Sequence, residues 1–243
     1  MKRSCHLLLS TVFGVLGALP CCARAAPLIV LADTGAQMPL AEARDGRVVA
    51  GMHYDLGQAL AKLLGRTAVF RSLPRKRIAQ ALEQGQGDIV CLYMAPWLPG
   101  KLHWTQHFFP YSEVVVTSRG VERPRALADL ADQQIGTVLG YVYPDLEQAL
   151  GERFRRADAV SGWNNLRKLS LGRVRHVSTL TLFVDYYRKQ GGKLDIHPPL
   201  LVRTYLTQCA VSPRSGVSVD EVNRAIDKLL HDGELNKIMA HYR

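Results

Sequence analysis

The feature that most constrains the fold is an ordered alternation of helix and strand patterns between residues 51 and 116. In Tyr54–Leu64, apolar residues recur at helical spacing, which predicts an amphipathic helix. Segments 67–73 and 88–94 have the composition of strands, and a second helical pattern begins between them at Pro74. Strands separated by helices of this length are typical of βαβ units, so we expect an α/β fold with mostly parallel sheets.

The N-terminus has the pattern of a secretory signal. Lys2 and Arg3 precede an uncharged apolar stretch over residues 7–19, and Ala23-Arg24-Ala25 fits the small-x-small cleavage rule. The apolar stretch is too short for a transmembrane helix. We therefore expect residues 1–25 to be a cleaved signal peptide and the mature protein to be periplasmic.

The balance of charge is basic, with 31 Lys and Arg residues against 21 Asp and Glu residues. Such a balance can indicate binding to nucleic acid or to a membrane surface. Here export excludes nucleic acid, and the basic residues are scattered without interleaved aromatic residues. A solvated basic surface is therefore the interpretation we adopt, with no nucleic-acid partner.

Of the five cysteines, Cys91 and Cys209 lie outside the expected signal peptide. In an oxidising compartment, two cysteines can form a disulfide. Cys91 lies within an apolar strand pattern, however, where a free cysteine behaves as a small hydrophobic residue. The sequence leaves both alternatives open.

The second half continues the alternation of strands and helices. Val114–Val116 are expected in an extended crossing segment, and a return crossing is expected near 208–211. A strand over 135–139 is followed by a turn at Gly140 and a helix that opens at Pro144. This turn is either a seat for a carboxylate at free backbone N–H groups or an ordinary βα turn.

The order and spacing of these motifs resemble those of bacterial extracellular solute-binding proteins of ABC importers, in the family best known for polar amino acids. The resemblance covers nearly the whole chain after the signal peptide. The matching residues are Gly51, Tyr54, Asp55, Leu56, Ala59, Leu64, Gly65, Leu82, Gly87, Asp88, Pro110, Tyr111, Ile135, Gly136, Gly140, Asn223, Asp232, Gly233, Leu235, Ile238 and Tyr242.

The resemblance implies a two-lobed clamp of the type II periplasmic-binding-protein kind, in which two crossing strands join the lobes. Residues 26–114 and 210–243 would form lobe 1, and residues 115–209 would form lobe 2. The implied function is capture of a small polar solute, either an amino acid or a small carboxylate, by hinge closure for an inner-membrane ABC permease. We expect a monomer without catalytic activity, cofactor or metal.

Two motifs of the resembled family are missing. An arginine that holds the ligand carboxylate usually follows the strand ending near Met94, but the nearest cation here is Lys101. The second lobe of the family carries a motif with an aspartate, followed by a residue that pairs with the ligand ammonium. Here Arg175 replaces the aspartate of the motif, and Ser178 and Thr179 occupy the following positions. A buried Arg175 would repel an ammonium.

Five residues are predicted to contact the ligand. Tyr93, Trp97 and Tyr141 would supply aromatic walls, because such pockets are lined by aromatic groups with few polar anchors. Gly140 would let the backbone approach the ligand. Arg77 matches an arginine of a Pro-Trp-x-Arg variant motif, in which Arg75 stands in place of the tryptophan, and Arg77 or Arg75 would lie at the cleft mouth. Arg77 could equally lie on a solvated helix face, as Tyr93 could lie in the core.

Other classes of function remain as alternatives. The same fold includes periplasmic cyclohexadienyl dehydratases, which would need a cleft carboxylic acid with a raised pKa as a general acid. The acids to consider are Glu42, Glu113 and Asp145. A sensory binding protein that docks on a receptor is the third alternative. His103 and His107 have no neighbouring cysteine or acid, so a zinc site is not expected.

Overall fold

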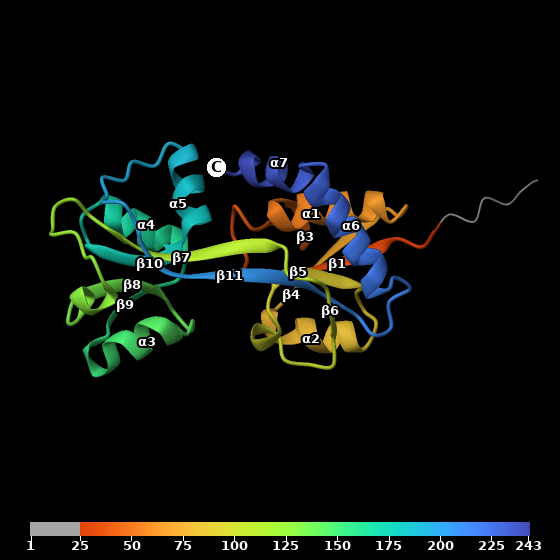
Figure 1. Ribbon diagram of the computed structural model, residues 1–243, viewed down its shortest axis with the longest axis horizontal. Helices are drawn as coiled ribbons and strands as arrows, with labels where there is room; N and C mark the ends of the chain where they lie inside the picture. Colours follow the sequence, from red (N-terminus) through yellow and green to blue (C-terminus); the bar gives the residue numbers. More distant parts are fainter. Residues whose placement is uncertain (1–24) are drawn as a thin grey trace, which may run out of the picture.

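The computed structural model of the protein describes residues 25–243, so the predicted signal peptide lies outside the described residues. Two α/β lobes lie side by side and share one nine-stranded sheet (Figure 1). The strands follow the order β4-β1-β5-β11-β7-β10-β8-β9, and β6 pairs with β11. Within the described residues, no helix is long and apolar enough to span a bilayer.

Lobe 1 is built around parallel strands. Strand β1 pairs in parallel with both β4 and β5. The elements of this lobe are β1 (Leu28–Asp33), the hairpin β2 (Glu42–Arg44) and β3 (Arg47–Ala50), α1 (Met52–Leu63), β4 (Ala68–Leu73), α2 (Arg75–Glu83), β5 (Ile89–Tyr93), the 3-10 turn η1 (Ala95–Trp97), β6 (His103–Trp104), α6 (Val219–His231) and α7 (Glu234–His241).

Lobe 2 repeats this arrangement with a second parallel set, in which β8 pairs with both β9 and β10. Its elements are η2 (Leu127–Leu130), β8 (Gln134–Val138), α3 (Pro144–Leu150), η3 (Gly151–Arg153), β9 (Arg155–Ala159), α4 (Gly162–Ser170), β10 (His176–Leu180) and α5 (Thr181–Lys189). The predicted alternation of strands and helices is therefore confirmed in both lobes.

Two long strands carry the chain between the lobes. Strand β7 (Phe109–Thr117) and strand β11 (Leu200–Val211) pair in antiparallel fashion. In lobe 1, β11 also pairs with β5, and in lobe 2, β7 also pairs with β10. Strand β11 thus joins the strands of lobe 1, strand β7 joins those of lobe 2, and their pairing connects the two sets. The expected lobe boundaries, after residues 114 and 209, fall within these strands.

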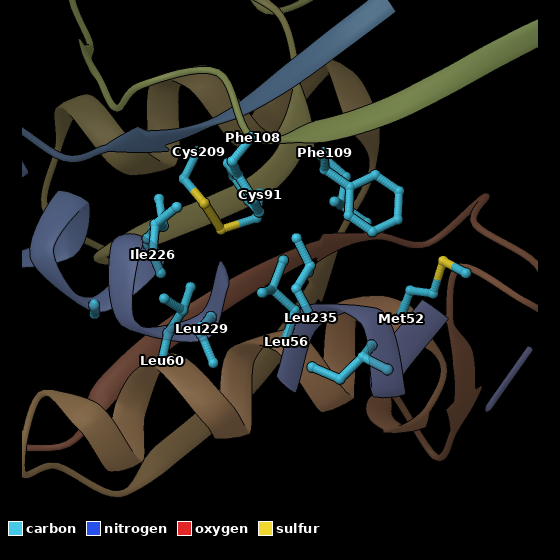
Figure 2. Packing of buried hydrophobic residues seen from close by; sticks show 14 of the residues in the cluster. Met52, Leu56, Leu60, Cys91, Phe108, Phe109, Cys209, Ile226, Leu229 and Leu235 are labelled. Carbon is cyan, nitrogen blue, oxygen red and sulfur yellow. A yellow bond between two sulfur atoms is a disulfide. The ribbon is translucent and has the colours of Figure 1, made fainter. Parts of the chain in front are cut away.

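The core of lobe 1 lies mainly between the sheet and helices α1, α6 and α7, with α2 on the opposite face (Figure 1). Leu56 and Leu60 of α1 meet Ile226 and Leu229 of α6 in this core (Figure 2). A capping box starts α6: the Ser218 hydroxyl accepts the Glu221 N–H, and the Glu221 carboxylate accepts the Ser218 N–H.

The two cysteines form a disulfide at the centre of this core (Figure 2). Cys91 of β5 and Cys209 of β11 are direct partners in the antiparallel pairing of these strands. The structure therefore decides between the two alternatives that the sequence left open. The bridge fastens a crossing strand to the sheet of lobe 1.

Replacement of both Cys91 and Cys209 by serine should lower the free energy of unfolding by about 2–5 kcal/mol, because the bridge closes a long loop. Urea unfolding of the variant and of the protein starting at Ala26 measures this difference. Unfolded, unreduced protein should show no free thiol. Two reactive thiols in that sample would contradict the structure.

Stability should also depend on His53, which lies in the first turn of α1. Burial lowers its pKa to about 4, and its Nδ1 has no hydrogen-bond partner among residues 25–243. In the unfolded chain, the imidazole takes up a proton near pH 6.5. Between these two values the unfolded state binds more protons, so stability falls as the pH is lowered.

From pH 7 to pH 5, the wild-type protein should lose about 2 kcal/mol more unfolding free energy than His53→Gln, which has no titrating ring. Urea unfolding of both proteins at the two pH values provides the comparison. Equal losses in both proteins would show that His53 is not buried in its neutral form.

Candidate ligand-binding site

The middle of the crossing strands lies between the ends of the two parallel sets of strands. Strand β5 of lobe 1 ends where Tyr93 pairs with Gln208, and strand β10 of lobe 2 ends where Leu180 pairs with Glu113. In open α/β sheets, ligands bind beyond the carboxyl ends of the strands. The stretch of β7 and β11 between these points is therefore where a ligand would contact both lobes.

One face of this stretch carries aromatic and charged side chains. Tyr111 pairs with Tyr205 and Glu113 pairs with Arg203 across the two strands. Because directly opposed residues share a face and alternate residues return to it, all four lie on one side of the β7–β11 pair. We call this side the site face.

Lobe 1 contributes two aromatic residues and an arginine to the site face. The ring of Trp97, in η1, lies edge-on to that of Tyr205, with the ring centroids 5.2 Å apart. The Arg75 guanidinium lies 5.0 Å from the ring centroid of Tyr93, and Arg75 Nη2 lies 3.5 Å from the Trp97 carbonyl oxygen. A cation over an aromatic face is attracted by the ring quadrupole, so Tyr93 positions Arg75.

Lobe 2 contributes Asp145, in the first turn of α3. Its carboxylate forms a salt bridge with Arg203 and accepts a hydrogen bond from the Tyr205 hydroxyl at 3.2 Å. Only 14% of the Asp145 side chain is exposed, which weakens solvent screening of the pair. Trp97, Tyr205 and Asp145 thus form a continuous contact from lobe 1, through β11, to lobe 2.

Glu113 is the half-buried acid of the site face. Its carboxylate accepts a hydrogen bond from the Ser178 hydroxyl of β10 at 3.0 Å. Burial raises the pKa of Glu113, and the charge of Asp145 adds to this rise, while the bond from Ser178, the Tyr205 hydroxyl and the charge of Arg203 oppose it. Burial of the Tyr205 phenol, together with the negative charges of Glu113 and Asp145, raises the pKa of Tyr205 to about 12.

The structure brings most of the predicted ligand residues to this region. Tyr93 is buried at the end of β5, and Trp97 is half-buried in η1. Tyr141 is 55% exposed in the loop after β8, and its phenol is close enough to raise the pKa of Tyr93. Gly140, beside it, has a φ of 79°. Arg77 is exposed on α2, and Arg75 is the arginine that contacts Tyr93 and Trp97.

Arg175 does not meet the condition for repelling an ammonium group. It is exposed just before β10, at the start of that strand, so it is not a buried cation. Lys101, the nearest cation after Met94, is exposed, and its backbone N–H donates to the Glu83 carboxylate.

Sequence reasoning missed Arg203 and Tyr205 altogether and gave Glu113 no distinctive role. Their only detectable pattern was alternation along an extended strand. Which alternate residues face the ligand region depends on the pairing of β7 with β11, which joins positions about 90 residues apart. Within the described residues, no group of three or more histidine, cysteine, aspartate or glutamate side chains is arranged to hold a metal ion.

The lobes also meet on a second flank. Helix α5 of lobe 2 lies toward α7 of lobe 1 (Figure 1). The Lys189 ammonium at the end of α5 donates to the His241 carbonyl of α7 at 2.6 Å, and the rings of Tyr186 and Tyr242 are 6.3 Å apart. A shallow hollow of ≈ 430 Å³ beside this contact is lined by Gln37, Met38, Trp163, Tyr186 and Gln190. Since α5 belongs to lobe 2 and α7 to lobe 1, rotation of the lobes would change this contact.

A two-lobed α/β fold with polar and aromatic side chains gathered between the lobes is the architecture of a solute-binding protein. The family model for bacterial extracellular solute-binding proteins, family 3, matches residues 29–243, so the chain belongs to this family. Comparison with curated protein sequences gives no match.

Solved structures share the fold at low sequence identity. The ancestral amino acid-binding protein AncCDT-1, a precursor of cyclohexadienyl dehydratase, is 18% identical with a TM-score of 0.69, and the match covers 90% of this chain and 96% of that chain. The second substrate-binding domain of GlnP from Lactococcus lactis, in an open conformation, is 17% identical with a TM-score of 0.64 and coverages of 90% and 96%. ArtJ, an arginine-, lysine- and histidine-binding protein from Geobacillus stearothermophilus, is 15% identical with a TM-score of 0.65 and coverages of 89% and 94%.

Proposed function

We propose that this protein captures a small polar solute in the periplasm by closing its two lobes, and delivers it to an inner-membrane ABC permease. The observation that carries the proposal is the site face, where side chains from both lobes meet those of the crossing strands. Its family membership and the predicted signal peptide support the location.

The mechanism follows from the way the lobes are joined. The chain passes between the lobes along β7 and β11, and two strands can bend as a hinge while each lobe keeps its own core. A solute held between Tyr93 and Trp97 on one side and Tyr141 on the other would favour the closed state. Closure would then create the surface that the permease recognises. The protein would act as a monomer.

An amino acid is the first class of solute to test. Three structural neighbours are an amino acid-binding protein, a GlnP substrate-binding domain and the arginine-, lysine- and histidine-binding protein ArtJ. The site face carries both arginine and carboxylate groups, as a zwitterion requires. The alternative is a small carboxylate. It would have to bind Arg75, because the other arginine of the site face, Arg203, is already paired with Asp145.

A thermal-shift screen tests the proposal as a whole. The protein starting at Ala26 should be stabilised by one member of a panel of amino acids, polyamines, dicarboxylates, aromatic acids and sugar acids. A compound at a hundred times its Kd should add roughly 2.7 kcal/mol, because it binds the folded state only. A panel without any stabilising compound would count against solute capture and favour a sensory or docking role.

Trp97→Ala tests the position of the site. Loss of the indole should weaken binding of the strongest compound at least tenfold in calorimetric titration, because the ring forms a wall of the proposed cleft. Trp104→Ala is the matched control, since Trp104 is also half-buried and packs against the same cluster of lobe 1. Equal affinities in the two variants would remove Trp97 from the site.

One observation favours a second candidate function. Glu113 is a carboxyl group with a raised pKa between the lobes, which is what a general acid in an elimination reaction needs. One structural neighbour is a precursor of cyclohexadienyl dehydratase. Product formation from prephenate or arogenate by the wild-type protein, lost in Glu113→Gln, would establish an enzyme. Unchanged substrate after prolonged incubation would remove this candidate.

A further inference from the structure

The charged groups of the site face are not evenly paired. Arg203 is bonded to Asp145, and Arg75 lies over the ring of Tyr93. Glu113 receives a hydrogen bond from a neutral hydroxyl, that of Ser178, and forms no salt bridge in the described part of the chain. The charge of its cross-strand neighbour Arg203 opposes the rise that burial causes in the pKa of Glu113, but Arg203 is ion-paired with Asp145, so no described cation is bonded directly to this half-buried carboxylate.

A second group beside Glu113 also lacks a partner. Tyr111 lies two residues earlier on β7 and therefore on the same face, and its side chain is only 4% exposed. Its hydroxyl is buried without a hydrogen-bond partner among the described residues. Buried polar groups are nearly always hydrogen-bonded, so an orphan hydroxyl next to a ligand region indicates a bond made with the ligand.

Aromatic rings lie on the same face as these two oxygen-bearing groups. The rings of Tyr205 and Trp97 lie in contact on the site face, and Tyr93 is close enough to Tyr111 to affect its pKa. Aromatic faces attract ammonium and guanidinium groups. A carboxylate, a hydroxyl oxygen that can accept a hydrogen bond, and aromatic walls together match a protonated nitrogen rather than an anion.

We propose that Glu113, assisted by the Tyr111 hydroxyl, binds the protonated nitrogen of the solute, which is an amino acid or another amine. This inference rests on the proposed solute-binding function. It places the cation-binding group on a crossing strand and compensates for the motif that is missing at Arg175. With Arg75 free to meet a carboxylate from the lobe 1 side, the arrangement suits a zwitterion.

Calorimetric titration with L-arginine, L-glutamine, putrescine and succinate tests this assignment. The wild-type protein should bind at least one of the three nitrogen-bearing probes and should not bind succinate. Glu113→Gln should weaken that binding at least tenfold. Tyr111→Phe, which keeps the ring and removes only the hydroxyl, should weaken it by a smaller factor. The control Glu152→Gln removes one exposed negative charge from η3 of lobe 2 and should leave the affinity unchanged.

Each result bears on the assignment. A probe that binds Glu113→Gln as tightly as wild type, with an unchanged melting temperature, would overturn the role of Glu113 and leave solute capture intact. Tight binding of succinate alone would do the same. A wild-type protein that binds none of the four probes would overturn the assignment, and the broader thermal-shift panel would then decide whether solute capture fails with it.

Discussion

The antiparallel pairing of β7 with β11 is the interaction on which the rest of the structure depends. It carries the chain from one lobe to the other and back, and it joins the two parallel sets of strands into one sheet. It also fixes which residues form the site face. Because side chains alternate along a strand, a slip of one residue between the two strands would put Glu113 and Tyr205 on opposite faces. The disulfide between Cys91 and Cys209 holds β11 in place against lobe 1.

Much of the fold could be predicted from local patterns. The helical spacing in Tyr54–Leu64 corresponds to α1, and the capping box at Ser218 corresponds to the start of α6. Such features depend on residues close in sequence, so their periodicity is sufficient. The disulfide depends instead on the pairing of two strands 118 residues apart in sequence, which no local pattern contains.

The candidate site could be predicted only in part, for the same reason. Tyr93 and Trp97 follow a buried strand, where ligand residues are expected in an α/β fold, and the structure places both beside the crossing strands. The choice between Arg75 and Arg77 depends on the rotational phase of α2 against the sheet. Arg203 faces Asp145 because β11 returns past α3, a contact between residues far apart in the chain. Their charges could be counted from the sequence, but their pairing could not.

The claim that the lobes bend about β7 and β11 to enclose a solute is tested most directly by small-angle X-ray scattering. The radius of gyration of the protein starting at Ala26 would be measured without ligand and with saturating amounts of its most strongly stabilising compound. The radius should fall on binding, and the fall should be absent in Trp97→Ala at the same concentration of compound. An unchanged radius in wild-type protein that calorimetry shows to be saturated would contradict hinge closure.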